Sequence, residues 1–272
     1  MSEPSTARLA RQEPGIPRLS REEFAGMRKA GRLAADTLDH AAGLVRPGVS
    51  TGFLDAACHE FIVGHGGTPA PLHYKGFPKS ICTSVNHVVC HGIPGDKVLH
   101  DGGIVNIDVT VIVDGWHGDS SRMYFAGHVG RKAARLCDAT YEAMMCGIAA
   151  VRPGATTGDI GHAIRSFAEH QRTSVVRDFC GHGIGRIFQG AEILHYGEPG
   201  DGIPLVEGMC FTVEPMLNAG RPEVRMLPDG WTAVTRDKSL SAQFEHTIGV
   251  TADGREIFTR SAIGRDRPPY GG

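Results

Sequence analysis

The chain has 272 residues, of which 41% are hydrophobic and 21% charged, as in an ordinary globular protein with enough apolar residues for a sizeable core. A formal net charge of −2 provides no basic field that would favour nucleic acid or an acidic membrane. Seven cysteines without a Cys-x-x-Cys pair argue against a disulfide framework and a Cys-rich zinc finger, and favour a reducing cytoplasm.

The first part of the chain predicts a loose extension followed by two helices. Residues 1–18 contain three prolines among polar residues and lack the basic and apolar regions of a signal peptide, so we expect a flexible extension. Ser20-Arg21-Glu22-Glu23 is a capping-box pattern that opens a helix, which stops before Arg46-Pro47-Gly48. A second helix follows Ser50-Thr51 and ends near residues 64–67. The first helix carries an apolar stripe at helical spacing, formed by Phe24, Met27, Leu33, Ala34 and Leu38.

The next segments are β-rich. Residues 68–79 are loop-like, and residues 81–89 form a strand region that leads into Cys90-His91-Gly92-Ile93-Pro94. No run of about 18 apolar residues occurs here or elsewhere, so no segment is expected to span a membrane.

A hairpin is predicted around Asp114-Gly115, a dipeptide that favours a tight two-residue turn. That turn pairs Thr110 with Asp119 and Asp108 with Ser121, and these four side chains share one face because strand side chains alternate. Asp108 and Asp119 are then diagonal neighbours, about 7–8 Å apart at their backbones. Two carboxylates this close inside apolar strands repel each other and lose hydration, and a divalent cation would relieve both costs. The plain alternative is one exposed turn acid and one capped acid in an ordinary hairpin.

The second half begins with two more predicted helices. They cover residues 130–150 and 156–170 and are separated by Arg152-Pro153-Gly154. From residue 175 onward, short β-rich runs alternate with Gly/Pro turns, and residues 261–272 form a surface tail.

A repeat relates the two halves of the chain. Arg46-Pro47-Gly48-Val49-Ser50-Thr51-Gly52 recurs 106 residues later, from position 46 to position 152, as Arg152-Pro153-Gly154-Ala155-Thr156-Thr157-Gly158. The same offset aligns Asp108 with Glu214. Each half is therefore predicted to contain two helices followed by a strand that bears an acid. Two such halves would join their acid-bearing strands in one central sheet with the helices outside. The sequence therefore predicts an α+β fold of two pseudo-symmetric halves.

Further candidate ligands lie in the second half. His182 stands among glycines in the segment Phe179–Gly185, where backbone can approach a ligand closely. Glu214 ends one β-rich run, and Glu245 lies in an alternating strand. Taken singly, His182 could be a core histidine whose hydrogen bonds are made within the protein, and Glu214 could be a capping residue. The glycines around His182 resemble a dinucleotide loop only weakly, because no helix-forming run follows them.

Together these segments resemble one known family. The ordered combination of Asn-Ile-Asp, His-Gly-Asp, Gly-His-Gly-Ile-Gly, Phe-Thr-Val-Glu-Pro and Gln-Phe-Glu-His-Thr is similar to the type I methionine aminopeptidases of bacteria, which are M24 peptidases. The resemblance runs from about residue 20 to about residue 260. It implies a pita-bread fold, in which pseudo-two-fold halves share a central antiparallel sheet with outer helices. One catalytic domain would cover residues 19–260, between the extension (1–18) and the tail (261–272).

The resemblance also implies a dinuclear metal site. Asp108 would chelate one ion, His182 and Glu214 would bind the other, and Asp119 and Glu245 would bridge the two. Four carboxylates balance two dications, and cobalt, manganese, iron or zinc would suit oxygen-rich ligands with one imidazole. Two such ions activate water and polarise a scissile carbonyl. Glu214 is the expected proton shuttle.

Other residues are expected to bind the substrate. His91 matches the family's histidine that hydrogen-bonds the scissile amide, whereas Gln189 stands where the family has a second catalytic histidine, and His195 lies too far along to replace it. Glutamine donates a neutral hydrogen bond but carries no charge and relays no proton, so we expect a weakened or respecialised enzyme. The methionine side chain would occupy an apolar, aromatic and sulfur-bearing pocket that suits a flexible thioether, formed by Tyr74, Phe77, Cys82, Phe188 and Trp231.

Three functions follow from these patterns. The leading one is a cytoplasmic, monomeric, two-metal aminopeptidase that removes initiator methionine from nascent chains when the second residue is small. The second is an M24-fold enzyme for another peptide or amide, such as a proline-directed aminopeptidase. The third is a binding protein without catalysis, favoured only by Gln189. Nascent chains would bring the protein to the ribosome, although no basic patch indicates ribosome contact, and no membrane or specific nucleic acid is expected as a partner.

Overall fold

The computed structural model of the protein describes residues 15–270. The extension predicted for residues 1–18 thus lies outside the described residues as far as residue 14, and the predicted tail does so at residues 271 and 272. Residues 17–19 follow the backbone of the second half, since Pro17 O accepts a hydrogen bond from Cys210 N (3.0 Å) and Leu19 N donates to Gly208 O (2.7 Å).

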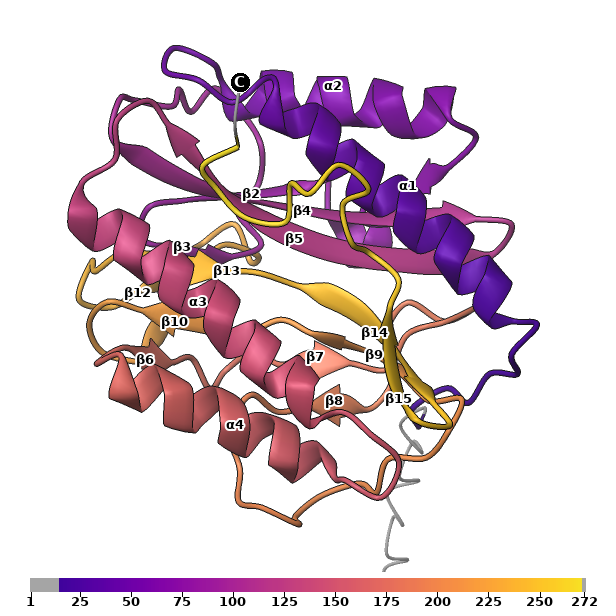
Figure 1. Ribbon diagram of the computed structural model, residues 1–272. Helices are drawn as coiled ribbons and strands as arrows, with labels where there is room; N and C mark the ends of the chain where they lie inside the picture. The colour runs from indigo at the N-terminus through magenta and orange to yellow at the C-terminus, as the bar shows by residue number, and fades with distance from the viewer. Residues whose placement is uncertain (1–14, 271–272) are drawn as a thin grey trace, which may run out of the picture.

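Within residues 15–270, four α-helices lie on one side of the strands, as Figure 1 shows. The first helix buries its predicted apolar stripe. Its capping box is confirmed, because Ser20 N donates to Glu23 Oε2 (2.9 Å) and Glu23 N donates to Ser20 Oγ (3.2 Å), and helical geometry begins at Phe24. The helices are α1 (Phe24–Ala42), α2 (Thr51–Gly64), α3 (Arg131–Ala150) and α4 (Thr157–His170), with a 3-10 turn η1 (Tyr74–Gly76).

The central β layer is divided into five antiparallel sheets within the described chain. The division arises because most strands of the second half have only two to four residues between Gly/Pro turns. The strands are β1 (Thr68–Pro69), β2 (Cys82–Val85), β3 (Val88–Cys90), β4 (Gly103–Val113), β5 (Trp116–Ala126), β6 (Ser174–Val175), β7 (Gly181–His182), β8 (Glu192–Ile193), β9 (Cys210–Val213), β10 (Met216–Asn218), β11 (Val224–Met226), β12 (Ala233–Thr235), β13 (Ser241–Gln243), β14 (His246–Thr251) and β15 (Gly254–Ile257).

The β4–β5 hairpin has the predicted register. Asp108 lies opposite Ser121, and Thr110 lies opposite Asp119. The turn residues Asp114 and Gly115 have φ values of 50° and 79°, the left-handed geometry of the tight turn that matches strand twist. Asp108 and Asp119 are therefore diagonal neighbours on one face.

The repeat of 106 residues is also a structural repeat. Helices α2 and α4 begin alike: Ser50 Oγ accepts from Phe53 N, and Thr156 Oγ1 accepts from Asp159 N. Backbone hydrogen bonds before these helices recur at the same offset: Gly48 N to Leu99 O (2.8 Å), Gly154 N to Leu205 O (3.0 Å), Gly52 N to Gly95 O (2.7 Å) and Gly158 N to Asp201 O (2.9 Å). The predicted division into two related halves is confirmed.

Each half has its own apolar core. One cluster joins α1 and α2 to β4, and the other joins α3 and α4 to β9, β13 and β14. An isolated bridge between Ser121 and Glu245 links the halves at the centre of the molecule. This arrangement brings the acids within β4 and β5 and the acid that follows β9 to one place.

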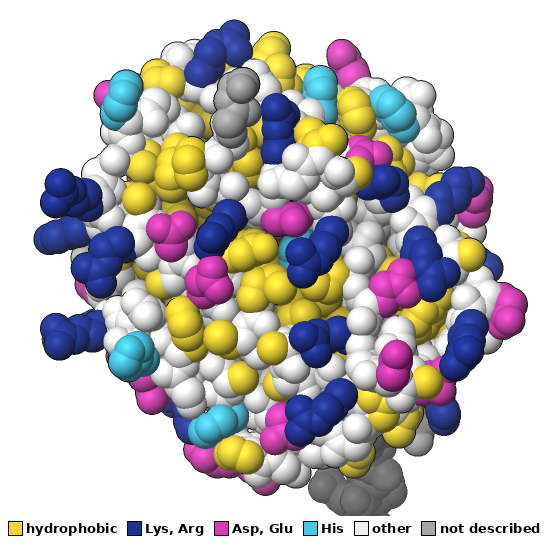
Figure 2. Space-filling model, viewed as in Figure 1, with side chains coloured by type: hydrophobic (Ala, Val, Ile, Leu, Met, Phe, Trp, Pro, Cys, Tyr) yellow, Lys and Arg dark blue, Asp and Glu magenta, His cyan; other side chains and the backbone are white. Residues whose placement is uncertain are grey.

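The chain after β15 crosses the helix side of the molecule between α1 and α3, drawn in yellow in Figure 1. On this face Lys and Arg side chains lie among Asp and Glu side chains, without one continuous basic patch (Figure 2). Within residues 15–270, no helix has the length and apolarity that crossing a bilayer requires.

Candidate metal centre and its pocket

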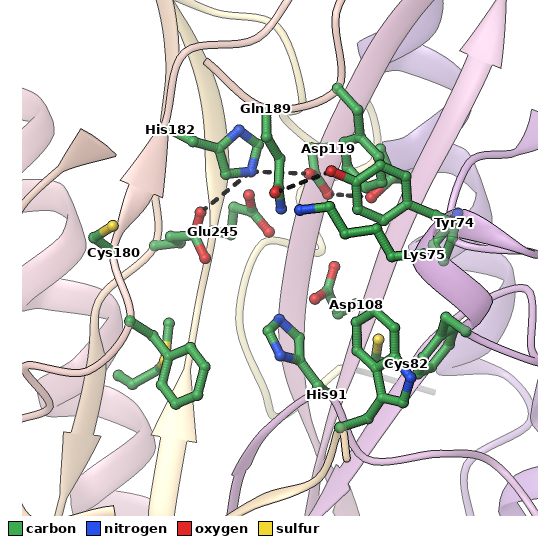
Figure 3. Close-up of a pocket in the computed structure, with 18 of the residues that line it drawn as sticks. Tyr74, Lys75, Cys82, His91, Asp108, Asp119, Cys180, His182, Gln189 and Glu245 are labelled. Atoms are coloured by element: carbon green, nitrogen blue, oxygen red, sulfur yellow. Dashed lines mark hydrogen bonds and ion pairs between the residues drawn. The ribbon is translucent and has the colours of Figure 1, made fainter. Parts of the chain in front are cut away.

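Both halves of the molecule contribute side chains to one central pocket of about 570 Å³. Asp108 and Asp119 come from β4 and β5, His182 ends β7, Glu214 follows β9, and Glu245 precedes β14. All five of these predicted ligands line the pocket. Figure 3 shows the side chains of Asp108 and Asp119 converging with those of His182 and Glu245 from two sides.

The distances within this group are those of a compact cluster. His182 Nε2 lies 3.6 Å from Asp119 Oδ2 and 3.7 Å from Glu214 Oε1. Asp119, His182 and Glu245 each offer one ligand atom within 4.8 Å of the others. Asp108 faces the same space, and its carboxyl group interacts electrostatically with Asp119 and Glu214.

Burial and mutual repulsion disfavour the charged form of the carboxyl groups in this cluster. Burial raises the pKa of Asp108 well above its usual range, and the charges of Asp119 and Glu214 add to the increase. The pKa of Glu245 is raised in the same way, chiefly by burial and then by Asp119. Burial also raises the pKa of Glu214 to about 7, although His182 opposes the increase. A bound cation would reverse these penalties.

The imidazole responds to the same charges. Burial alone would lower the pKa of His182, but its interactions with the nearby carboxylates of Asp119 and Glu214 outweigh burial and raise it. Glu245 Oε1 is buried without a hydrogen-bond partner. An unsatisfied buried carboxylate oxygen is costly unless an ion or water meets it. The donor set and this orphaned oxygen fit divalent cations that accept oxygen and imidazole ligands.

Neutral hydroxyl and amide groups orient the carboxylates. Thr110 Oγ1 donates to Asp119 Oδ1 (2.7 Å), Thr212 Oγ1 donates to Glu214 Oε1 (2.7 Å), and Gln243 Nε2 donates to Glu214 Oε2 (3.3 Å). Such partners fix ligand geometry and tune affinity for the ion. Sequence reasoning missed Thr212 and Gln243 in this role. Each lies two residues before an acid, which is the spacing that places two strand residues on one face.

Two motif glycines are explained by close contacts between elements. A Cβ at Gly118 would lie 2.4 Å from the carbonyl carbon of Ala30, so β5 packs directly against the backbone of α1. A Cβ at Gly181 would lie 2.4 Å from Thr212 O, so β7 packs equally closely against β9. This second contact holds His182 beside Glu214.

An apolar compartment adjoins the cluster. Phe77 and Trp231 pack edge to face with ring centroids 5.1 Å apart, and the Tyr74 and Phe188 rings lie 4.6 Å apart. His91 stands at the side of this compartment with φ of 54°, and burial lowers the pKa of its ring. All six predicted substrate-binding residues line the pocket, namely Tyr74, Phe77, Cys82, His91, Phe188 and Trp231.

Gln189 also lines the pocket, and its Oε1 accepts a hydrogen bond from Tyr74 OH (3.2 Å). His195 lies behind Glu214 instead: its Nε2 accepts from Glu214 N (3.2 Å), and burial lowers its pKa to about 3. Several lining residues were missed by sequence reasoning, although each stands within a few positions of a predicted one; they are Lys75, Asp178, Phe179, Cys180, Glu192 and Met216.

This arrangement combines two chemical environments. The carboxylates and imidazole would hold divalent cations, and the aromatic compartment would hold a medium-sized apolar side chain next to them. A ligand whose side chain fills that compartment would have its main chain at the cluster.

Known proteins resemble this chain in both sequence and fold. The chain matches metallopeptidase family M24 over residues 25–252. The methionine aminopeptidase of Rickettsia prowazekii is 62% identical over 251 residues, covering 92% of this chain and 97% of that protein. Its crystal structure has a TM-score of 0.89 and covers 90% of this chain and 100% of that one. The methionine aminopeptidase of Escherichia coli K12 is 52% identical over 241 residues, covering 88% and 91%. A prolidase from Pyrococcus furiosus is 20% identical with a TM-score of 0.70, covers 90% of this chain and 66% of that one, and shows likeness of fold alone.

Proposed function

The chain belongs to metallopeptidase family M24, and from this membership and its pocket we propose that it is a metal-dependent aminopeptidase that removes initiator methionine when the second residue is small. Its fold is the pita-bread fold of the methionine aminopeptidases. One observation carries the proposal: four carboxylates and His182 meet beside an aromatic compartment of suitable size for a thioether side chain.

The proposed metal site uses the five clustered donors. Asp108 would hold one divalent ion, His182 and Glu214 a second, and Asp119 and Glu245 would be shared between them. Cobalt, manganese, iron or zinc would suit these ligands. Bound divalent ions would supply the electrophilic chemistry that activates water and polarises a carbonyl.

Side chains of the pocket would bind the substrate and transfer the proton. The aromatic compartment would bind the methionine side chain, and the α-amine of the substrate would lie near the ion that Asp108 holds. His91, neutral because burial lowers its pKa, would hydrogen-bond the scissile amide. Glu214 would accept a proton from the attacking water and pass it to the leaving amine.

The proposal is tested by release of methionine from the peptide Met-Ala-Ser. We expect release by the chelator-treated protein only after divalent metal is added, and none by Asp108→Asn at the same metal concentration. Release of the first residue from X-Pro peptides, with Met-Ala-Ser untouched, would contradict the proposal and support a proline-directed enzyme instead.

Gln189 gives a second test of the same reaction. If glutamine weakens catalysis by lacking charge and a transferable proton, Gln189→His should raise kcat by up to about a hundredfold. The measurement is steady-state release from Met-Ala-Ser at matched metal content. A histidine variant no faster than the parent would refute this role.

We also propose a cellular location, an oligomeric state and a partner for the protein. The substrate class would place the protein near nascent chains at the ribosome, as a monomer in the cytoplasm. Buried, unbridged thiols such as Cys58, Cys137 and Cys210 suit a reducing compartment. Sedimentation velocity would test the monomer, and co-sedimentation with translating ribosomes would test the contact.

A further inference from the structure

One lysine side chain lines the pocket from the turn that carries Tyr74. Lys75 lies in η1, and its Nζ is 5.1 Å from the centroid of the Tyr74 ring. In Figure 3 the Lys75 side chain extends inward along that ring, with its ammonium group directed toward Gln189 and the acidic cluster. Among the described residues that line the pocket, Lys75 is the only lysine or arginine.

The backbone of this turn has an unusual conformation. Lys75 has φ of 46° and ψ of 29°, and His73 has φ of 68°, a region that residues with a Cβ rarely adopt. Short backbone hydrogen bonds fix the turn, from Tyr74 N to Pro71 O (2.9 Å) and from Phe77 N to Tyr74 O (2.9 Å). Left-handed non-glycine residues held in this way are concentrated at functional sites.

A second donor contacts the same tyrosine as Lys75. The Oε1 atom of Gln189 is occupied by the hydroxyl of Tyr74, at 3.2 Å. The amide nitrogen of Gln189 is therefore left to donate, and Gln189 and Lys75 both line the pocket. A neutral donor and a cationic donor thus face the same part of the pocket.

The proposed reaction needs such donors at one position. When water adds to the carbonyl carbon, the C=O electron pair moves onto oxygen, and it returns as the C–N bond breaks and the amine leaves with a proton. Donors aimed at that oxygen stabilise the charge that develops, and charged donors do so more strongly than neutral ones. The pocket also has six acidic residues that would repel this charge, namely Asp108, Asp119, Asp178, Glu192, Glu214 and Glu245.

We propose that Lys75 and Gln189 together bind the carbonyl oxygen of the scissile bond, with Lys75 supplying the positive charge that neutral Gln189 and His91 lack. Neither residue gives up a proton in this role. The inference rests on the proposed aminopeptidase function and names two of its catalytic residues.

The first test uses Lys75→Met, which keeps most of the length of the side chain and removes its charge, and Lys75→Arg, which keeps the charge. We expect Lys75→Met to lower kcat for Met-Ala-Ser by about tenfold to a hundredfold, with KM and bound metal close to the parent values. Lys75→Arg should retain most of the activity. An unchanged kcat would overturn the proposal. So would a loss confined to KM that depends on the charge of the third peptide residue, because Lys75 would then bind the outgoing peptide.

The second test does not depend on turnover. The phosphonic acid analogue of methionine presents anionic oxygens at the position of the carbonyl, whereas methionine amide is uncharged there. Calorimetry on the metal-loaded protein should show that Lys75→Met weakens binding of the phosphonate by about tenfold and leaves binding of the amide nearly unchanged. Equal effects on both ligands would overturn the proposal.

A double variant tests whether Lys75 and Gln189 act on the same oxygen. In a Gln189→His background the imidazole can itself carry charge, so Lys75→Met should cost a smaller factor in kcat than it does in the parent. Equal factors in the two backgrounds would contradict a shared target. If the metal-loaded parent fails to release methionine, the aminopeptidase function itself is wrong, and the phosphonate measurement still decides whether Lys75 binds an anion.

Discussion

At the scale of single residues, Thr212 connects two of the candidate metal ligands. Its hydroxyl donates to Glu214 Oε1 (2.7 Å) and accepts from the backbone N of His182 (2.9 Å). Thr212→Val removes both bonds at nearly constant volume, so it should weaken divalent metal binding by about tenfold or more. Calorimetric titration of metal into the chelator-treated protein would measure this loss.

The matched control for that variant is Thr140→Val. Thr140 is a buried threonine whose hydroxyl donates to Leu136 O within α3, away from the pocket. Its replacement should leave metal affinity unchanged. Equal metal affinities for Thr212→Val and the control would show that Thr212 does not orient the site.

A buried histidine predicts part of the response to acid. Burial lowers the pKa of His246 to about 3, and the charges of Arg122 and Arg260 act in the same direction. The unfolded chain binds this proton near pH 6.5 and the folded chain does not, so the stability that neutral His246 allows is present above pH 6.5 and is lost as the pH falls toward 3. In His246→Gln, the free energy of unfolding should therefore fall less steeply between pH 6 and 4, by up to about 1.4 kcal/mol per pH unit.

Urea unfolding of the metal-free protein at several pH values would measure those slopes. His128→Gln, at an exposed loop position, is the control and should keep the slope of the parent. Parallel curves for the parent and His246→Gln would contradict the buried neutral state.

The acids of the site could be predicted because they combine charge with strand spacing. Asp108 and Asp119 fall on one face of a hairpin whose turn sequence fixes the register, and Glu214 repeats Asp108 at the offset of 106 residues. Lys75 and Gln243 could not be predicted in the same way. Their place in the pocket depends on a left-handed turn and on contacts between segments far apart in the sequence.

At the scale of elements, the contact between α1 and β5 depends on a glycine in β5. A Cβ at Gly118 would overlap the backbone of Ala30, where no flexible side chain can move aside. Gly118→Ala should lower the free energy of unfolding by about 1–3 kcal/mol, because an overpacked interface has to separate. It should also weaken metal binding, since Asp119 is the next residue on the same strand.

The control for this variant is Gly64→Ala at the end of α2. An added Cβ there would meet nothing within 4 Å, and alanine is a better helix former than glycine. We expect Gly64→Ala to be neutral or slightly stabilising in urea unfolding. A parent-like stability for Gly118→Ala would mean that β5 and α1 separate at little cost.

The helices and the long hairpin could be predicted from local signals, and the short strands could not. Ser50 and Thr156 mark the starts of α2 and α4 through their own side chains, and Asp114-Gly115 specifies a turn. Strands such as β6, β7 and β8 have two residues each and exist only through pairing with distant segments. No periodicity develops over so few residues.

At the scale of the whole molecule, the last described segment joins the two halves. Ser261 Oγ donates to Asp39 Oδ2 in α1 (2.9 Å), and Tyr270 OH donates to Met123 O in β5 (2.8 Å). Asp266 Oδ1 lies 3.8 Å from Arg122 Nη2, and the Arg122 side chain is only 1% exposed. The sequence predicts a surface tail over residues 261–272. Nothing in the sequence of this segment indicates that Asp266 contacts a buried arginine.

Removal of residues 261–272 should therefore destabilise the protein far more than loss of a surface segment would. Arg122 would keep Asp39 Oδ1 at 2.6 Å but would lose Asp266, and β5 would lose the packing of Tyr270 on Tyr124. Exposing one side of a buried ion pair that has lost a partner costs about 3–5 kcal/mol. Urea unfolding should show a decrease of that size in the free energy of unfolding. Arg267→Ala, which removes the exposed pair with Glu142 and the contact of the guanidinium with the Tyr141 ring, should cost less than about 1 kcal/mol. A truncated chain as stable as Arg267→Ala would mean that Asp39 alone is sufficient to stabilise Arg122. It would also mean that residues 261–272 are not needed to hold the two halves together.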